Sequence, residues 1–291
     1  MECGDKMYKP KITIITAAFN AGKTIGQTIC SVLSQDYENI EYIIVDGGST
    51  DNTLKILNRY KCDRRLHYIS EKDSGIYNAL NKAVALASGD YIEVLGADDA
   101  LAGNTVISSV SSELSDDIDV WSGLVYGVDE ETCRQRIIGD NHIARDRNKY
   151  KGGMIAHSGM FVKKKLLLKY PFDETYKIAA DYKFFLQCYN DENIKFKFSD
   201  LVVSYFSLAG VSSKDNACDL ENARIYRELG LPYYDVIIYD DSKVKYILKV
   251  LLTKMFMYDV ALCLYKRFAK YFWSKHACLN KVCRWCGRNN L

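Results

Sequence analysis

The sequence lacks the long apolar runs that mark membrane-spanning and secreted proteins. No stretch reaches the roughly 18 uncharged apolar residues of a spanning helix, and the N-terminus has no apolar signal-peptide core. A cytoplasmic protein is therefore expected. Internal repeats and low-complexity segments are also absent, and 291 residues with 48% apolar composition can bury a substantial core, which argues against disorder. This length suits one large domain, or one domain with an appendage.

The ten cysteines have no regular framework spacing, and a cytoplasmic protein of this size does not need disulfides. Most are therefore expected to be reduced thiols in the core. His276, Cys278, Cys283 and Cys286 form a short cluster that could in principle bind zinc. One CxxC is weak evidence for such a site, and the spacing fits no known zinc finger.

Acidic residues are almost absent from the C-terminal tail. Residues 243–291 contain eight lysines and three arginines against one acid, Asp259. Because the whole chain carries a net charge of +2, the tail holds +10 and the remainder −8. This asymmetry predicts an anionic partner for the tail, with a membrane surface favoured over nucleic acid.

A continuous helix over the tail would gather a basic stripe on one side. The stripe contains Lys245, Lys249, Arg267, Lys270 and Ser274, interrupted by Leu252 and Phe256. Two shorter helices in a hairpin fit as well. Peripheral attachment to the inner leaflet through residues 243–275 is the functional interpretation. Packing against the catalytic body, or against the second copy in a homodimer, is the alternative.

The first hundred residues alternate β-branched runs with amphipathic segments, which is typical of a parallel sheet built from βαβ units. Three helices are expected between four strands, the second one capped by Ser49 or Thr50. The expected strands are Lys11–Thr16, Glu41–Val45, Leu66–Ser70 and Tyr91–Leu95, and the expected helices are Thr24–Ser34, Asp51–Tyr60 and Ile76–Ala87.

Beyond the fourth strand the pattern is less regular. Arg145–Gly153 resembles a mobile loop, and Gly127–Cys133 is a polar segment between two strands. The further expected strands are Val120–Val125, Arg136–Ile138, Met160–Val162 and Val202–Phe206, and the further helices are Asn104–Leu114, Asp181–Tyr189 and Ala217–Leu229.

Polar residues follow each of the first four strands, where ligands bind in open α/β sheets. The first strand leads into a loop of small residues with Phe19, which could accept a flat base. The second ends at Asp46, followed by Gly47 and Gly48, which permit a close approach or a positive φ. Asp46 could bind a uracil imide or a ribose hydroxyl, or it could simply cap the next helix.

The third and fourth strand ends add charge. Asp73 follows the third strand, and Lys72 and Lys82 near it are either phosphate contacts or solvated surface residues. The fourth strand runs into Asp98 and Asp99. Adjacent carboxylates at the end of a buried strand repel each other and are costly to desolvate, so a cation is the simplest compensation. Oxygen ligands suit Mg²⁺ or Mn²⁺ shared with a diphosphate.

Together these residues carry a family resemblance. Over roughly residues 10–210 the sequence resembles the inverting glycosyltransferases with a GT-A fold, commonly called family 2. The matching segments are Ile14–Asn20, Val45–Asp51, Asp73–Lys82 and Ser88–Tyr91 leading to Asp98 and Asp99. The resemblance implies a Rossmann-like, mostly parallel α/β sheet flanked by helices, with a catalytic domain over residues 1–240 and a helical extension over 241–291. Residues 10–100 would bind the nucleotide-sugar and 101–240 the acceptor.

The resemblance also implies roles for individual residues. Thr16, Ala17 and Phe19 would line the nucleoside pocket, and Asp46 would recognise the base, usually uracil. Asp73 and Lys82 would lie near the nucleotide or its diphosphate. Asp98 would contact ribose or sugar, and Asp99 would ligate Mn²⁺ or Mg²⁺. Ala97 stands where the commonest pattern has an acid, so metal binding rests chiefly on Asp99.

Inversion by direct displacement needs a base that takes the proton of the acceptor hydroxyl. Asp181 is the candidate, because many relatives carry a Glu-Asp pair here and this sequence has Ala180 in place of the first acid. Asp181 could also cap the helix that follows. His157 precedes a strand in a segment that borders the acceptor and leaving group in similar enzymes. It could donate to a phosphate oxygen or serve a structural role.

The function expected from this set is transfer of a sugar from a UDP-sugar to a lipid-linked saccharide, as resemblance to O-antigen, capsule and exopolysaccharide enzymes implies. Two other interpretations remain: a sugar nucleotidyltransferase, and a catalytically silent, membrane-attached nucleotide-binding scaffold. No nucleic-acid partner is expected.

Overall fold

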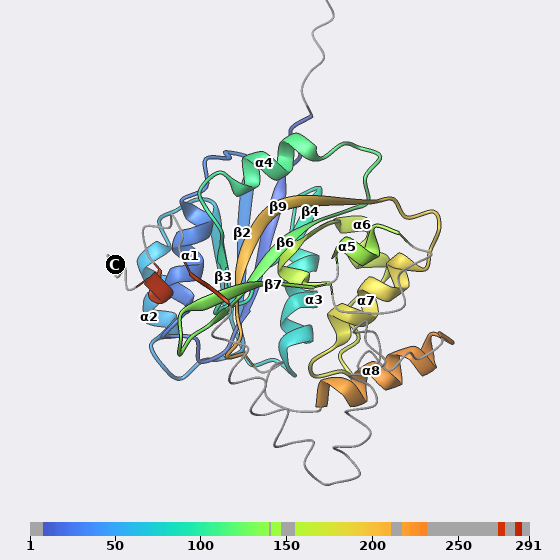
Figure 1. The fold of residues 1–291 in the computed structure, drawn as a ribbon. Helices are drawn as coiled ribbons and strands as arrows, with labels where there is room; N and C mark the ends of the chain where they lie inside the picture. The colour runs from blue at the N-terminus through green and yellow to red at the C-terminus, as the bar shows by residue number, and fades with distance from the viewer. Residues whose placement is uncertain are drawn as a thin grey trace, which may run out of the picture.

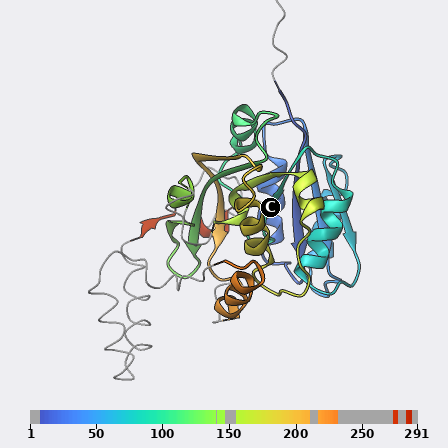
Figure 2. The ribbon, with the colours of Figure 1, turned by 90° about the vertical axis from the view of Figure 1, so that its right-hand side faces the viewer.

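The computed structural model describes residues 8–139, 141–146, 155–210, 217–231, 273–276 and 283–286. A mixed sheet of ten strands forms its centre, in the order β10-β7-β6-β8-β4-β1-β2-β3, with β9 paired to β6 and β5. Helices flank the sheet (Figures 1 and 2). The strands are β1 Ile12–Ala18, β2 Ile40–Asp46, β3 Leu66–Ser70, β4 Tyr91–Val94, β5 Ala100–Leu101, β6 Val120–Asp129, β7 Arg134–Ile138, β8 Met160–Lys163, β9 Phe196–Ser207 and β10 Ser274–Lys275.

The N-terminal half is the parallel sheet expected from the sequence. β1 lies between β2 and β4, and β2 pairs with β3, all in parallel register. The carboxyl ends of these four strands therefore meet at one edge. In the second half β6 pairs antiparallel with β7 and β8, and parallel with β9. Strands β6 and β9 are longer than their apolar runs suggested, because cross-strand pairing continues through polar residues such as Asp129 and Lys197.

The helices follow the expected spacing closely. They are α1 Ile25–Leu33, α2 Thr53–Leu57 continued by a 3₁₀ turn at Asn58–Tyr60, α3 Ile76–Leu86, α4 Val106–Glu113, α5 Asn141–Ala144, α6 Lys164–Lys169, α7 Ala180–Tyr189 and α8 Ala217–Glu228. The prediction that Ser49 or Thr50 caps α2 is wrong. The helix begins at Thr53, and the hydroxyl of Ser49 instead donates to Asp46.

Alternate side chains of the strands pack into two cores, one on each face of the sheet. Ile15 and Val45 face α3 and α7, whereas Ile14 and Ile44 face α1 and α4. Both faces of the sheet are covered, so both sets of alternate side chains are apolar. For this reason β1 and β2 appear as continuous apolar runs in the sequence. The result is a three-layer arrangement with α1 and α2 on one side and α3 and α7 on the other (Figure 1).

Cysteine burial agrees with the expected core placement only in part. Cys188 of α7 is buried, but Cys62 is exposed and Cys30 and Cys133 are intermediate. Burial raises the pKa of the Cys188 thiol to about 12, so this side chain stays protonated at neutral pH. Cysteines in short loops such as the one at Cys62 have no core to enter.

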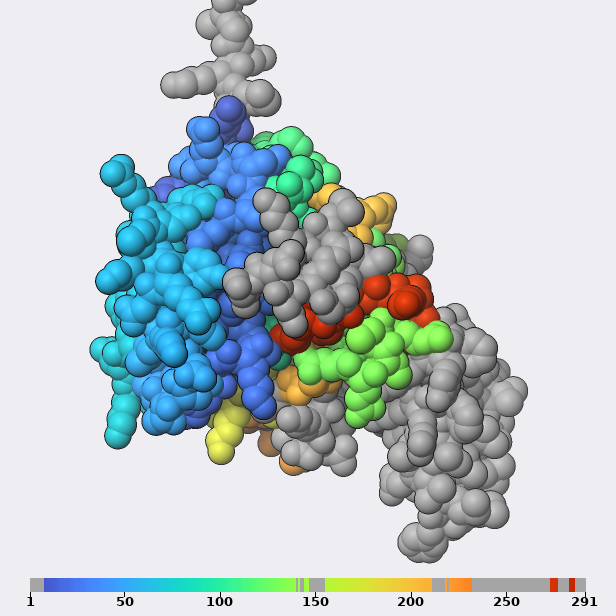
Figure 3. Space-filling model, turned by 90° about the vertical axis from the view of Figure 1, so that its left-hand side faces the viewer, coloured from blue at the N-terminus to red at the C-terminus, as the bar shows by residue number. Residues whose placement is uncertain are grey.

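The described parts of the tail lie against the body. Ser274 and Lys275 pair with Gln135 and Arg134 of β7, so the expected helix is wrong at Ser274, where the backbone joins the sheet edge. Residues 284–286 form a 3₁₀ turn, η6. Figure 3 shows these residues, in red, between the blue N-terminal part and the green segment of the chain. The basic stripe from Lys245 to Lys270 and most of the loop 145–153 lie outside the described residues.

Among the helices that the structure describes, none combines the length and apolar character needed to cross a membrane.

One buried carboxyl group in β4 has no hydrogen-bond partner among the described residues. Glu93 is 0% exposed, and both of its carboxylate oxygens are unpaired. Burial, with a further contribution from the charge of Asp99, raises the pKa of Glu93 well above its ordinary value. The folded protein therefore keeps a proton on Glu93 that the unfolded chain releases, and stability falls as pH rises above the ordinary pKa of a glutamate.

We predict that Glu93→Gln stabilises the fold more at pH 8 than at pH 5, because glutamine has no proton to lose. Urea unfolding at both pH values measures the difference.

Glu41→Gln is the matched control, for which the pH dependence should have the opposite sign. Burial raises the pKa of Glu41, but hydrogen bonds from Ser88 and Thr13 and the charge of Lys11 outweigh it and lower the pKa to about 2. Glu41→Gln should destabilise the fold more at pH 8 than at pH 3. Equal effects of Glu93→Gln at both pH values would contradict the prediction.

Candidate active site

The acid pair Asp98 and Asp99 lies directly beyond β4. Asp99 is 1% exposed. Its Oδ1 accepts a hydrogen bond from the backbone N–H of Ser207 at 2.9 Å and its Oδ2 accepts one from Gly96 at 3.3 Å. Asp98 is more exposed and lies next to Gly210, where a Cβ would stand 3.6 Å from its Oδ2. The end of β9 thus fixes one acid and leaves the other open to a ligand.

The electrostatics of the pair favour a cation. Burial and the charge of Asp98 together raise the pKa of Asp99 to about 7. Burial also raises the pKa of Asp98. A divalent ion would reverse these shifts and keep both groups ionised. Within the described residues no set of three His, Cys, Asp or Glu side chains could hold a metal. Asp99 and Asp98 therefore fit an ion that takes its remaining oxygen ligands from a diphosphate and water.

Asp46 ends β2 and organises the loop after it. Its carboxylate accepts hydrogen bonds from the N–H groups of Gly48 and Ser49 and from the hydroxyls of Ser49 and Ser70. These bonds close a loop, so Asp46 does not cap α2. Gly48 has a φ of +83°, and a Cβ on Gly47 would stand 2.7 Å from Oδ2 of Asp73. Both glycines are therefore needed, one for its φ and one for the approach of Asp73.

The start of α3 carries the charges expected near a phosphate, but most of them are already paired. Lys82 Nζ lies 2.6 Å from Glu71 Oε1. Asp73 accepts a hydrogen bond from the N–H of Gly75, and Lys72 is exposed. The structure thus brings Asp73 to the Asp46 loop, while Lys82 is paired with a carboxylate from the loop that follows β3.

The three predicted nucleoside contacts differ in what they offer. Phe19 is 67% exposed at the end of the β1 loop, so its ring is available to a base. Ala17 is partly buried. Thr16 is fully buried, and its hydroxyl donates to the carbonyl of Leu95 at 2.7 Å and contacts the hydroxyl of Tyr42 at 3.1 Å. The side chain of Thr16 is therefore engaged within the sheet and is not free to contact a nucleoside.

His157 and Asp181 form the second polar centre of this edge. His157 Nδ1 lies 3.0 Å from Asp181 Oδ2, and the hydroxyl of Tyr77 donates to Asp181 Oδ1 at 3.1 Å. His157 lies in the 3₁₀ turn η2, His157–Gly159, before β8, Tyr77 in α3 and Asp181 in the first turn of α7. The N-cap of α7 is Ala179, so the alternative in which Asp181 itself caps the helix is wrong.

Each member of the pair favours the charged form of the other. Burial alone would raise the pKa of Asp181, but the hydrogen bond and charge of His157, with Tyr77, lower it overall. Burial would lower the pKa of His157, but Asp181 chiefly, with Asp99 and Asp98, raises it. The imidazole of His157 thus interacts electrostatically with both acid centres: Asp98 and Asp99 beyond β4, and Asp181 in α7.

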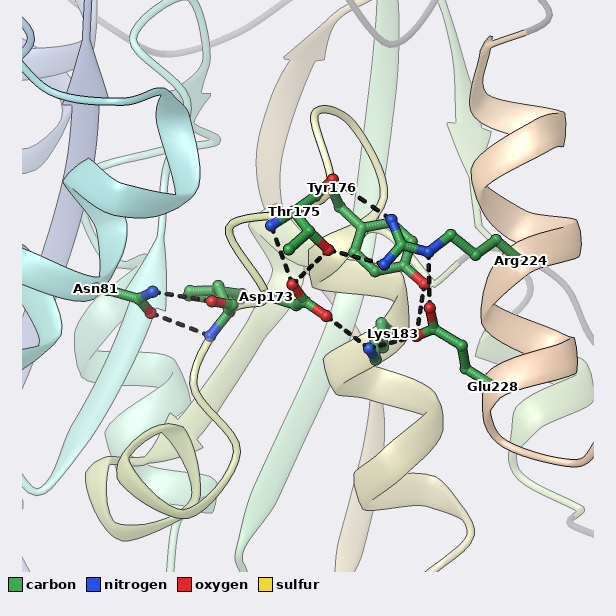
Figure 4. Close-up of polar contacts among 8 residues, drawn as sticks. Asn81, Asp173, Thr175, Tyr176, Lys183, Arg224 and Glu228 are labelled. Atoms are coloured by element: carbon green, nitrogen blue, oxygen red, sulfur yellow. Dashed lines mark hydrogen bonds and ion pairs between the residues drawn. The ribbon is translucent and has the colours of Figure 1, made fainter.

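Helix α8 and the loop before α7 hold Asp181 in place. The carboxylate of Glu221 in α8 accepts hydrogen bonds of 2.8 to 2.9 Å from three successive N–H groups, those of residues 177 to 179. Ala179 is the N-cap of α7 and the other two residues precede it, so α8 fixes the loop that leads into the helix and satisfies the N–H of its N-cap. Figure 4 shows the rest of this contact, where Lys183 bridges Asp173 and Glu228, and Arg224 lies over the ring of Tyr176.

The same loop also contacts α3. Glu174 accepts hydrogen bonds from the side chains of Asn78 at 3.0 Å, Asn81 at 3.1 Å and Ser74 at 3.4 Å. Glu174, Glu221 and Tyr77 were missed by sequence reasoning. Tyr77 stands inside a family motif without an assigned chemical role, and the two glutamates are about 100 and 40 residues from their partners, so no local pattern announces them.

The candidate zinc cluster is only partly described. His276 Nε2 lies 3.4 Å from Cys283 Sγ, and His276 Nδ1 lies 2.6 Å from Gln135 Oε1. Both residues are buried with Tyr205 and Trp285. Cys278 and the side chain of Cys286 lie outside the described residues. What is described there is a packing cluster.

The chain matches the family described as glycosyl transferase family 2 over residues 13–170. A relative from Mycobacterium bovis, a PGL/p-HBAD biosynthesis glycosyltransferase, is 30% identical over 212 residues, which are 71% of this chain and 81% of the relative.

Solved structures show the same fold. S. aureus TarS 1–349 in complex with UDP superposes with a TM-score of 0.57 at 21% identity, over 68% of this chain and 60% of that chain. The mannosyltransferase PcManGT from Pyrobaculum calidifontis, in complex with GDP-Man and Mn²⁺, has a TM-score of 0.57 at 19% identity, over 78% of this chain and 66% of that chain. The expected GT-A α/β fold is confirmed, and the family match with the M. bovis relative shows that this chain belongs to glycosyl transferase family 2.

Proposed function

We propose that this glycosyltransferase inverts the anomeric centre as it transfers a sugar from a UDP-sugar to a hydroxyl group of a lipid-linked saccharide, in surface polysaccharide biosynthesis. The observation that carries the proposal is the His157–Asp181 pair beside the acid pair at the end of β4. It supplies one ionised carboxylate for one proton transfer, as a single displacement requires.

The donor half of the proposal rests on the loop around Asp46. Its carboxylate is buried and accepts hydrogen bonds from Gly48, Ser49 and Ser70, so a uracil imide would have to replace one of these donors. The ring of Phe19, 67% exposed, would stack on the base. The solved relative TarS was crystallised with UDP, whereas PcManGT was crystallised with GDP-Man, so the choice of base is a matter for experiment.

Asp99, with Asp98 beside it, would hold Mn²⁺ or Mg²⁺. When bound, the ion neutralises the charge of the departing diphosphate. PcManGT was crystallised with Mn²⁺. Asp98 remains the contact for ribose or the sugar, because its carboxylate is the more exposed of the two. Lys82 is paired with Glu71, so any contact with the diphosphate would require it to leave that partner.

The base would be Asp181. Its carboxylate receives hydrogen bonds from Tyr77 and His157 and is 13% exposed, and the lowered pKa favours its ionised form before the acceptor binds. Proton transfer from the acceptor hydroxyl to Asp181 accompanies the attack of that oxygen on the anomeric carbon. His157, also near Asp98 and Asp99, balances the negative charge of this edge.

Two features favour transfer over the other interpretations. A sugar nucleotidyltransferase has no use for a buried carboxylate that is oriented by His157 and Tyr77 at a separate centre. A catalytically silent scaffold would have no use for Asp181, nor for the contacts from α8 that hold the start of its helix in place. The proposed peripheral contact with the inner leaflet rests on the basic composition of residues 243–275. The proposed acceptor is supported by similarity to the M. bovis PGL/p-HBAD biosynthesis glycosyltransferase.

The decisive experiment is a panel of UDP-, GDP- and TDP-sugars incubated with membrane lipid extract, with and without Mn²⁺. Release of nucleoside diphosphate is scored for each donor. We expect turnover with a UDP-sugar that depends on added metal. If the protein neither binds nor turns over any of these donors, the proposal is refuted. Consumption of a donor without release of nucleoside diphosphate would support the nucleotidyltransferase interpretation.

Asp181→Asn should lower kcat by about a hundred- to ten-thousandfold, because the acceptor hydroxyl loses its base. The Kd for UDP should stay within about threefold of wild type, since the substitution changes no donor contact. Steady-state kinetics and UDP titration measure the two quantities. A variant that keeps normal turnover would remove Asp181 from the mechanism.

His157→Asn should move the acid limb of the pH–rate profile to higher pH. Protonated His157 lowers the pKa of Asp181. Asparagine keeps a hydrogen-bond donor but removes the positive charge, so the pKa of Asp181 rises and the base becomes protonated at a higher pH. The dependence of kcat on pH, measured from pH 8 down to pH 3, tests this, and an unchanged limb would show that the charge of the imidazole does not lower the pKa of the base.

A further inference from the structure

Two routes connect the C-terminal turn η6 to the acid pair. Along the first, the backbone N–H of Arg284 donates to Gln27 Oε1 of α1 at 3.1 Å. The next residue of that helix, Thr28, donates its hydroxyl to the carbonyls of Ala97 at 3.1 Å and Asp99 at 2.7 Å. One turn of α1 thus holds both the acid pair and residue 284.

The second route runs through side chains. The Arg284 guanidinium forms an ion pair with Glu130. Glu130 Oε1 accepts a hydrogen bond from the Ser207 hydroxyl at 2.8 Å, and the Ser207 N–H donates to Asp99 Oδ1 at 2.9 Å. The contacts are independent of those through α1, so the position of Arg284 beside the acid pair is determined from two sides.

The guanidinium has more donors than partners. Its side chain is 20% exposed, and both Nε and Nη1 are buried with no hydrogen-bond partner among the described residues. A permanently charged group with unsatisfied buried donors is costly. The exposed Lys72 can be hydrated, Lys82 is paired with Glu71, and His157 is paired with Asp181. Arg284 is therefore the cation near the acid pair that most lacks acceptors.

We propose that Arg284 binds the diphosphate of the nucleotide-sugar donor, so that the C-terminal segment completes the donor site. The inference rests on the proposed function. A diphosphate that approaches Asp98 and Asp99 meets negative charge, and a planar guanidinium beside them supplies both a compensating charge and paired donors for phosphate oxygens.

The test compares Arg284→Gln, Arg284→Lys and wild type by UDP titration in the presence of Mn²⁺, with donor KM measured in parallel. Arg284→Gln should weaken UDP binding at least about tenfold, the loss expected for one hydrogen bond between charged groups. Arg284→Lys should lie between the two, because it keeps the charge and loses the fork. If Arg284→Gln does not fold, a loss of about threefold or more in Arg284→Lys supports the proposal and an unchanged Kd overturns it.

Two controls separate ligand binding from structural support. Arg65→Gln removes another partly buried arginine with a single carboxylate partner, Asp63 at 2.8 Å, and should leave UDP binding unchanged. Glu130→Gln removes the ion pair of Arg284 but not its charge, and should leave UDP affinity equal or higher. A loss in Glu130→Gln equal to that in Arg284→Gln would mean that the ion pair only supports the fold, and would overturn the proposal.

The result also separates this inference from the proposed function. A wild-type protein that binds UDP and turns over a UDP-sugar, with Arg284→Gln unaffected, refutes the role of Arg284 alone. A wild-type protein that neither binds UDP nor turns over any donor refutes the proposed function.

Discussion

Negative charge crowded into a desolvated edge of the sheet is the constraint on which this structure depends. Burial of Asp99 beside Asp98 raises the pKa of Asp99 to about 7, and Glu93 lies protonated in the strand that leads to them. Such a site is unfavourable unless a cation arrives, because carboxylates without a counter-charge are expensive to bury. The strand ends, the β9 amide at Ser207 and the turn of α1 at Thr28 all hold this edge in a geometry that a cation can use.

His157 is the point at which the two acid centres meet. It pairs with Asp181 at 3.0 Å and senses the charges of Asp98 and Asp99. A change of charge at Asp98 or Asp99 therefore alters the pKa of His157, which is paired with the proposed base Asp181. Family membership establishes a glycosyltransferase, while the pairing explains how a chain with Ala180 in place of a second acid retains one ionised carboxylate, oriented by a histidine and a tyrosine.

The elements around the site are positioned by contacts between distant parts of the chain. Glu221 in α8 holds the start of α7, and Glu174 joins the loop before α7 to α3. The described tail returns to the body through β10 and η6 instead of extending from it. These contacts couple the donor half to the proposed base, and they use carboxylates that look like ordinary surface residues in the sequence.

Local sequence patterns were sufficient to predict the order of strands and helices in the first hundred residues and the acids that follow the strands. Hydrophobic period and glycine requirements are local, so the places of Asp46, Asp98 and Asp99 at strand ends could be predicted from neighbouring residues, whereas their expected roles came from the other strand ends and the family resemblance. Their hydrogen-bond partners were decided by tertiary structure. The hydroxyl of Thr16 bonds within the sheet, and Lys82 pairs with Glu71. Asp181 contacts both His157 and Tyr77. These contacts could not be predicted, because side-chain direction and pairing depend on strands and helices that are far apart in the chain.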